Sequence, residues 1–229
     1  MDDMTKNLWQ SIVKSPVAQK PPERKRQDKK YKLIVAAKTL IHKKGFAETT
    51  LADIAHEADV PLGNVYYYFK TKEAIGLAVI DQRLKDWEVW RKKAMQHPLA
   101  LKRLQFFLEN FLSCEPEVEM TFPMGHLCEE FSREGGALAI ASKKFLKGFI
   151  DWLEEQCQLL GLAEHALTTT YTFLSMAQGA TLLGQSLQDD TIVHYQRVLI
   201  ERWLKGLDRH TIQKVGLVDL PQREYATLD

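Results

Sequence analysis

The sequence predicts an all-α protein in which a small three-helix head precedes a larger helical domain. Apolar residues recur at helical spacing through most of the chain, and no stretch shows a convincing strand-like alternation. Two short helical patterns around a turn signal lie near the N-terminus, and three long ones fill the C-terminal half. We therefore expect an N-terminal arm at residues 1–27, a head at 28–74 and a helical domain at 75–229.

Composition narrows the class of protein. The chain has 229 residues, of which 45% are hydrophobic, and this is enough for a substantial core. No segment approaches the ~18 apolar residues of a membrane span, and the N-terminus lacks the apolar core of a signal peptide. Cys114, Cys128 and Cys157 lie far apart, so we expect buried, reduced thiols rather than disulfides or a zinc site. The expectation is a cytoplasmic protein without a membrane span, a metal or a cofactor.

Charge is distributed unevenly although the net charge is only +1. Between Lys14 and Lys44 eleven basic residues face two acidic ones, an excess of nine. A basic segment of this kind favours a polyanionic partner, because neutralising phosphates releases counterions. A solvated basic run without a function is the alternative, and the helices that follow the run weaken it.

Residues 1–27 contain prolines and many charges, which predicts a flexible basic arm. Leu8, Trp9, Ile12 and Val13 also fit a short helix that docks on the protein, and the sequence leaves both possibilities open.

A first helix is expected from Asp28 to Lys44, with Gly45 ending it. Its apolar face is formed by residues at helical spacing, namely Tyr31, Ile34, Ala37, Leu40 and Ile41. Phe46 is then expected to pack beneath the two helices that follow.

Two short helices joined by a tight turn come next. The first spans about Thr50 to Ala58, and Thr49 or Thr50 can cap its start. Asp59 tolerates the left-handed backbone that such a turn needs. Pro61 stands where the second helix begins, and there its missing N–H costs nothing.

The second short helix, Leu62 to Phe69, buries Val65 and Phe69 one turn apart. Its outer side then carries Leu62, Gly63, Asn64, Tyr66 and Tyr68, while Tyr67 is expected to be the ring that packs inward. This is the pattern of a helix-turn-helix whose second helix enters a major groove.

At these residues the sequence resembles the N-terminal domain of the TetR family of bacterial transcription regulators. The resemblance lies in Thr49-Thr50, Ile54-Ala55, Ala58, Val60, the run Gly63 to Phe69, and Lys72-Glu73. Asp59 departs from it, since the family usually has glycine there. The resemblance implies a homodimeric, ligand-responsive regulator, expected to be a repressor of a palindromic double-stranded DNA operator.

The resemblance also implies roles for individual residues. Base edges are expected to meet Leu62, Gly63 and Asn64, the last by hydrogen bonding. The DNA backbone is expected to meet Thr50, Tyr66, Tyr68 and Lys72, which stands near the start of the next helix, where a phosphate is favoured. Short basic tails occur in the family, so Arg24 and Arg26 are expected to reach the minor groove or a phosphate.

A long helix from Glu73 to about Gln96 should link the head to the helices behind it. Later helices are expected at about 101–111, 137–160, 164–187 and 191–206. In the resembled family the last two long helices pair with their copies, and Ala177, Gly179, Ala180 and Gly184 would permit a close approach. An internal core is the alternative for these residues.

Phe122 to Leu127 resembles a Gly-Cys-Pro-x-Gly-Asn-Leu motif of one TetR subgroup, with Phe122 in place of the cysteine and His126 in place of the asparagine. The family's effector cavity lies beside this motif, so we expect a small apolar or aromatic ligand. Its binding residues would be Trp87, Phe107, Phe111, Phe122, Met124, His126, Phe149 and Trp152. Ordinary core packing is the alternative for each of them.

Two other classes of protein, an enzyme and a protein–protein adaptor, fit the sequence less well than a regulator does. His126, Cys128, Glu129 and Glu130 lie close enough for a catalytic dyad or a metal site, but no second ligand pair, Gly-rich phosphate loop or G-x-S-x-G elbow accompanies them. We therefore expect no enzymatic activity. A helical protein–protein adaptor without DNA binding would explain the helices but not the basic head.

Overall fold

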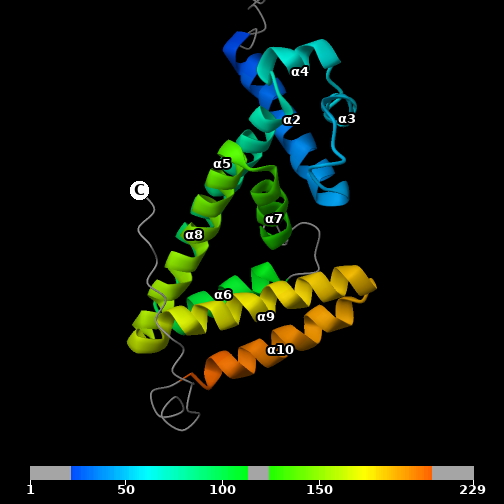
Figure 1. Ribbon diagram of the computed structural model, residues 1–229. Coiled ribbons are helices and arrows are strands. Elements are labelled where there is room, and N and C mark those ends of the chain that lie inside the picture. The colour runs from blue at the N-terminus through cyan, green and yellow to red at the C-terminus, as the bar shows by residue number, and fades with distance from the viewer. Residues whose placement is uncertain (1–21, 113–123, 208–229) are drawn as a thin grey trace, which may run out of the picture.

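The computed structural model describes residues 22–112 and 124–207, and helices are the regular structure of these ranges (Figure 1). The α-helices are α2 (Pro22–Lys44), α3 (Leu51–Glu57), α4 (Leu62–Tyr68), α5 (Lys72–Ala94), α6 (Ala100–Phe111), α7 (Met124–Glu134), α8 (Gly136–Leu159), α9 (Ala166–Leu187) and α10 (Asp190–Lys205). A short 3₁₀ turn, Ala163–His165, precedes α9. The all-α prediction is confirmed, and no described helix is long and apolar enough to cross a membrane.

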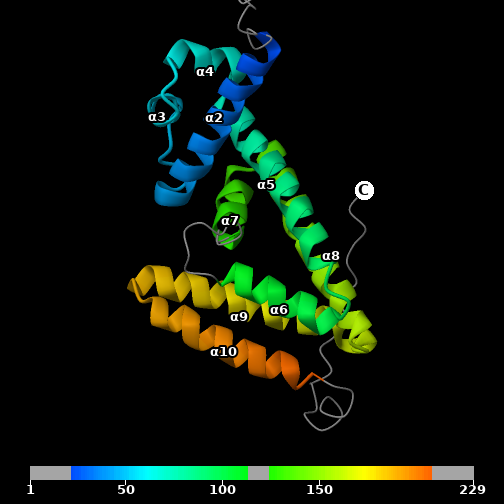
Figure 2. The same ribbon diagram turned by 180° about the vertical axis from the view of Figure 1, so that it is seen from behind.

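The helices form a head and a body joined by long elements. Helices α2, α3 and α4 make the head at one end, and α6, α9 and α10 form a layer at the opposite end (Figures 1 and 2). Helices α5 and α8 pack along each other between these ends, and α7 lies between the head and the far layer. The head therefore reaches the body through α5 and α7.

The first helix differs from its prediction in two respects. It begins at Pro22 rather than Asp28, and proline suits a first helical turn. Its buried face includes Ala37 and Ile41 as predicted, but Leu33 is fully buried, whereas Tyr31 is 55% exposed. Ile34 and Leu40 are partly buried against the core as predicted, so the buried face differs only at its N-terminal end, where Leu33 replaces Tyr31.

Helices α9 and α10 pack against each other within one chain. A Cβ on Gly184 would lie 2.7 Å from Val193 Cγ2, so this glycine serves the contact between α9 and α10. Ala177 and Ala180 are also buried inside the chain, as the core alternative predicted. The exposed apolar residues of the pair are instead Tyr171, Leu182, Leu183, Leu187, Tyr195 and Leu199.

Candidate nucleic-acid interface

Thr50 caps the first short helix of the motif, α3. Its Oγ1 accepts a hydrogen bond from the Asp53 N–H at 3.1 Å, and its own N–H donates to Asp53 Oδ2 at 2.9 Å. This is a reciprocal capping box. Lys44 Nζ donates to the same Asp53 oxygen at 2.7 Å, and it is the main cause that holds the pKa of Asp53 well below its usual value, followed by Thr50. The Thr50 side chain also lowers the Asp53 pKa through a hydrogen bond to its carboxylate, and its contact with the DNA backbone stays a prediction.

The turn between the two helices adopts the predicted left-handed backbone at Asp59, where φ is 52°. The Val60 N–H donates to Ala55 O at 2.9 Å and closes the turn. Pro61 is the N-cap of α4, and the chain continues directly into Leu62. Aspartate therefore takes the position that glycine usually holds in the resembled family, because its short polar side chain tolerates this conformation.

Helix α4 is anchored by Val65 and by Phe69, both of which are buried as predicted. On its outer side a Cβ built on Gly63 meets no atom within 4 Å, and Leu62 and Tyr66 are about half exposed. Asn64 is partly buried in the first turn. A backbone with no side chain at position 63 and an amide at position 64 can approach base edges closely.

The prediction for two of the three tyrosines was wrong. Tyr67, expected to pack inward, is 55% exposed, whereas Tyr68 packs partly against the core. The reason is helix geometry: Tyr68 lies three residues after the buried Val65 and shares its face, and Tyr67 does not. The two rings meet edge to face at 5.0 Å between centroids.

Lys72 sits at the start of α5, where Thr71 caps the helix by accepting from the Ala74 N–H at 3.0 Å. Its Nζ donates to Ala47 O at 2.7 Å and lies 4.6 Å from the centre of the Phe46 ring. The lysine therefore ties α5 to the connection between α2 and α3. An ammonium has three protons, so this bond still leaves donors for a phosphate.

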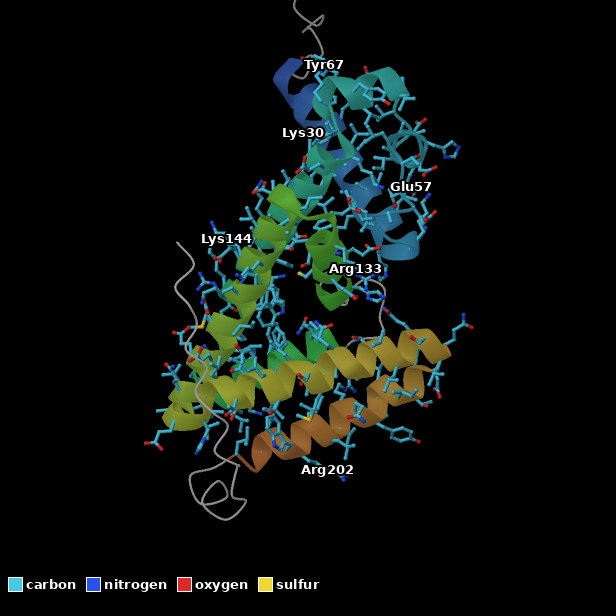
Figure 3. The ribbon with its side chains drawn as sticks, viewed as in Figure 1. Lys30, Glu57, Tyr67, Arg133, Lys144 and Arg202 are labelled. Carbon is cyan, nitrogen blue, oxygen red and sulfur yellow. The ribbon has the colours of Figure 1, made fainter. Side chains whose placement is uncertain are left out.

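Part of the basic segment is neutralised inside the protein. Lys38 pairs with Asp86 of α5 at 3.1 Å, and Lys44 pairs with Asp53. Exposed lysines lie at both ends of α2, with Lys29, Lys30 and Lys32 near its start and Lys43 and Lys44 in its last turn. Figure 3 shows Lys30 and Tyr67 at the same tip of the head. Arg24 and Arg26 belong to the first turns of α2, and their side chains lie outside the described residues.

Five of the predicted ligand residues come together in the body. Trp87 stacks on Phe149 at 3.9 Å between centroids and meets Trp152 edge to face at 5.5 Å. Phe107 contacts both tryptophans and stacks on Phe111 at 5.2 Å. All five are buried, and their rings fill the space between α5, α6 and α8. Trp90 of α5 belongs to the same cluster but was absent from the predicted set. Its position three residues after Trp87 places both rings on one face of the helix and could have predicted this.

The remaining predicted ligand residues lie elsewhere. His126 is exposed and lines a recess of about 350 Å³ beside the C-terminal turn of α2, away from the aromatic cluster. Met124 is the first residue of α7 and its side chain lies outside the described residues, as does Phe122.

The residues of α7 considered for a catalytic dyad or a metal site point in different directions. Cys128 is buried against Ser142 of α8, and burial raises the pKa of its thiol to about 11. His126 Nδ1 lies 3.7 Å from Glu129 Oε2 on the surface, while Glu130 Oε2 accepts from the Phe46 N–H at 2.8 Å. A thiol with a raised pKa carries little thiolate at neutral pH, so Cys128 is poorly suited to sensing electrophiles.

Comparison with known proteins agrees with this geometry. Residues 33–79 match the family model of the bacterial regulatory proteins of the tetR family. An uncharacterized HTH-type transcriptional regulator from the lacX 3′ region of Lactococcus lactis subsp. lactis is 30% identical over 173 residues, which are 70% of this chain and 85% of that protein. The HTH-type transcriptional regulator QacR of Staphylococcus aureus is 33% identical over 106 residues, which are 46% of this chain and 54% of QacR.

Solved structures share the fold. A TetR transcriptional regulator from Legionella pneumophila superposes with a TM-score of 0.67 at 24% identity, covering 75% of this chain and 95% of that one. The reduced form of E. coli NemR gives a TM-score of 0.64 at 19% identity, covering 76% and 96%. With its capped α3, left-handed turn and solvent-facing α4, the chain belongs to the TetR family and is a helix-turn-helix, DNA-binding transcriptional regulator.

Proposed function

We propose that the protein is a homodimeric repressor that leaves a palindromic operator when a small apolar or aromatic molecule binds its body. The observation that carries this proposal is the outer face of α4. It presents Gly63 and Tyr66 to solvent, with the partly exposed Asn64 between them, from a short helix whose other side is anchored by buried Val65 and Phe69. A rigid, narrow and partly polar face of this kind suits insertion into a major groove.

Dimerisation through α9 and α10 supplies the second head. The exposed apolar residues of these helices lie in the layer farthest from α4 (Figures 1 and 2). Covering them with a second copy would remove apolar area from water and leave both heads free. Two heads related by a two-fold axis read half-sites about 34 Å apart, so the operator should be palindromic.

Helix α7 provides a route from the body to the head. At its start, a Cβ on Gly125 would lie 3.0 Å from Gln178 Oε1 of α9, so α7 approaches α9 closely there. Farther along, Glu130 accepts from the Phe46 N–H at 2.8 Å, and Phe131 meets the Phe46 ring edge to face at 4.8 Å. Movement of α7 would therefore displace the connection that leads into α3.

Helix α5 provides the second route. It carries Lys72 against the same connection at one end and Trp87 and Trp90 in the aromatic cluster at the other. A ligand that favours one tilt of α5 would bias the spacing of the two heads. The motif Pro123-x-Gly125-x-Leu127 before and within α7 supports placing the chain in the subgroup that carries the Gly-Cys-Pro-x-Gly-Asn-Leu run.

The test is to sequence the genomic fragments that the purified full chain retains at low salt. We expect enrichment of a palindrome whose half-sites are about one helical turn apart, or a multiple of that spacing. Retention of no fragment would contradict DNA binding and favour the helical adaptor. Enrichment of a single half-site would contradict the proposed dimer.

A further inference from the structure

Two indole N–H groups in the aromatic cluster lack an acceptor. Trp90 is 6% exposed and Trp152 is 4% exposed, and the Nε1 atom of each is buried without a hydrogen-bond partner among the described residues. The two rings meet edge to face at 5.4 Å between centroids. A buried donor without a partner destabilises a fold, and two neighbouring donors of this kind indicate that something else supplies the acceptor.

The surroundings of these indoles are rich in donors. The buried Gln156, one turn after Trp152, donates from Nε2 to the Trp152 carbonyl at 3.2 Å. Its acceptor oxygen is already engaged by Arg103 Nη1 at 3.2 Å. Within the described ranges no Asp or Glu side chain is buried, so the body offers no buried carboxylate to neutralise a cation. Among the residues that the structure describes, the group missing beside these two indoles is a hydrogen-bond acceptor.

We propose that the effector is a flat aromatic molecule with carbonyl-type oxygen acceptors, neutral or anionic, whose oxygens accept from Trp90 and Trp152. This inference rests on the proposed function, because it names the ligand class that the body responds to. The two rings are in direct contact, with centroids 5.4 Å apart, and we expect one lactone, ester or quinone group lying beside them to accept from both donors. The flanking rings, Phe107 and Phe149, would cover the faces of the ligand.

Binding must part the rings, since they fill the space between α5 and α8. Trp87 stacks on Phe149 at 3.9 Å, and Trp87 belongs to α5 while Phe149 belongs to α8. A ligand inserted beside the two indoles therefore separates these helices. Because α5 carries the head at its other end, the separation tilts the head and changes its spacing from the partner head.

The test uses three bicyclic probes of similar size: coumarin with two acceptor oxygens, naphthalene with none, and the cation N-methylquinolinium. Their affinities for the full chain are measured by isothermal titration calorimetry. We expect coumarin to bind at least tenfold more tightly than naphthalene, and N-methylquinolinium to bind no better than naphthalene. Equal affinity for coumarin and naphthalene, or a preference for the cation, would overturn the proposal.

Substitution of single tryptophans tests whether the indole N–H groups of Trp90 and Trp152 donate to the ligand. Trp90→Phe and Trp152→Phe remove one N–H each and should each lower coumarin affinity about three- to tenfold, as expected for one hydrogen bond, while naphthalene affinity stays unchanged. Trp203→Phe is the matched control: it truncates a partly buried tryptophan of α10 that packs against the core outside the aromatic cluster, and the ratio of the two affinities should not change. A ratio that changes equally in all three variants would overturn the assignment.

DNA retention by the same proteins separates this inference from the proposed function. Wild-type chain that retains DNA but does not prefer coumarin refutes the ligand class alone. Chain that prefers coumarin but retains no DNA refutes the proposed repressor instead.

Discussion

The outer face of α4 and the aromatic cluster of the body differ in what they leave unsatisfied: the face leaves apolar side chains exposed, and the cluster leaves polar N–H groups buried. The face exposes Leu62 and Tyr66, which folding usually covers, while the cluster buries the indole N–H groups of Trp90 and Trp152, which water would usually satisfy. Each arrangement costs free energy in the isolated chain. The comparison teaches that both regions are shaped for a partner, a groove in one case and an acceptor-bearing molecule in the other.

The two regions meet at the connection between α2 and α3. The Phe46 ring packs against the Phe131 ring of α7 and lies beneath the Lys72 ammonium of α5. The Phe46 N–H donates a hydrogen bond to Glu130. Gly45 beside it has φ of +85°, and a Cβ there would lie 2.5 Å from Glu130 Oε1. Because Gly45 has no side chain, Glu130 of α7 can pack closely against the head.

The largest effect is expected at the outer face of α4. Asn64→Ala should cost about 1–3 kcal/mol of binding to the enriched operator while leaving affinity for unrelated DNA unchanged, because a base contact is lost and not a phosphate contact. Competition binding with operator and random duplex measures this. Glu57→Ala, an exposed change on α3, is the control and should alter neither affinity. A uniform loss on both duplexes would contradict base reading by Asn64.

Breaking the junction comes next. Glu130→Ala leaves the Phe46 N–H without its acceptor and should lower the free energy of unfolding by about 1 kcal/mol, measured by urea denaturation. Glu129→Ala is matched, since it removes an exposed ion pair with Arg133 on the same helix and should change stability by less than about 0.5 kcal/mol. Glu130→Ala should also weaken the release of DNA by ligand. Unchanged release would mean that α5 alone transmits the signal.

Lys72→Ala tests a phosphate contact of the head. Affinity should fall for every DNA sequence, and the slope of log affinity against log salt should flatten by about one. Lys85→Ala, on the same helix but paired with Asp81, is the control. Thermal unfolding of both variants accounts for the lost bond to Ala47 O. An unchanged slope at intact stability would remove Lys72 from the interface.

The smallest effect concerns the cap of α3. Hydrogen bonds from Lys44 and Thr50 depress the pKa of Asp53, so its contribution to stability is present above the unfolded pKa near ~4 and is lost only as pH falls through the lower folded pKa. Asp53→Asn should therefore be slightly less stable than wild type at pH 7, and the difference should shrink as the pH falls below ~4. A difference that does not depend on pH would contradict the role of the charge.

Much of the head was predictable because its signals are local. Thr50, Asp59 and Pro61 each act within a few residues, so the start of α3, the turn and the start of α4 all fell where the sequence placed them. The assignment of Tyr67 and Tyr68 failed, because which ring faces inward depends on how α4 sits on the rest of the head. The five aromatic side chains that converge in the body were predicted as ligand-binding residues from their type, and their role stays a prediction. His126 lies outside this cluster, because nothing local shows which way α7 turns.

By itself the sequence determined an all-α chain and a helix-turn-helix preceded by a basic segment, since caps, turns and helical periodicity are set by neighbours along the chain. Only the tertiary structure decided that Glu130 accepts from the Phe46 N–H, that Gly184 serves the contact between α9 and α10, and that the described residues offer no acceptor to the indole N–H groups of Trp90 and Trp152. These depend on groups that are distant in sequence, and a hydrogen bond or its absence is defined only once packing has brought both sides together.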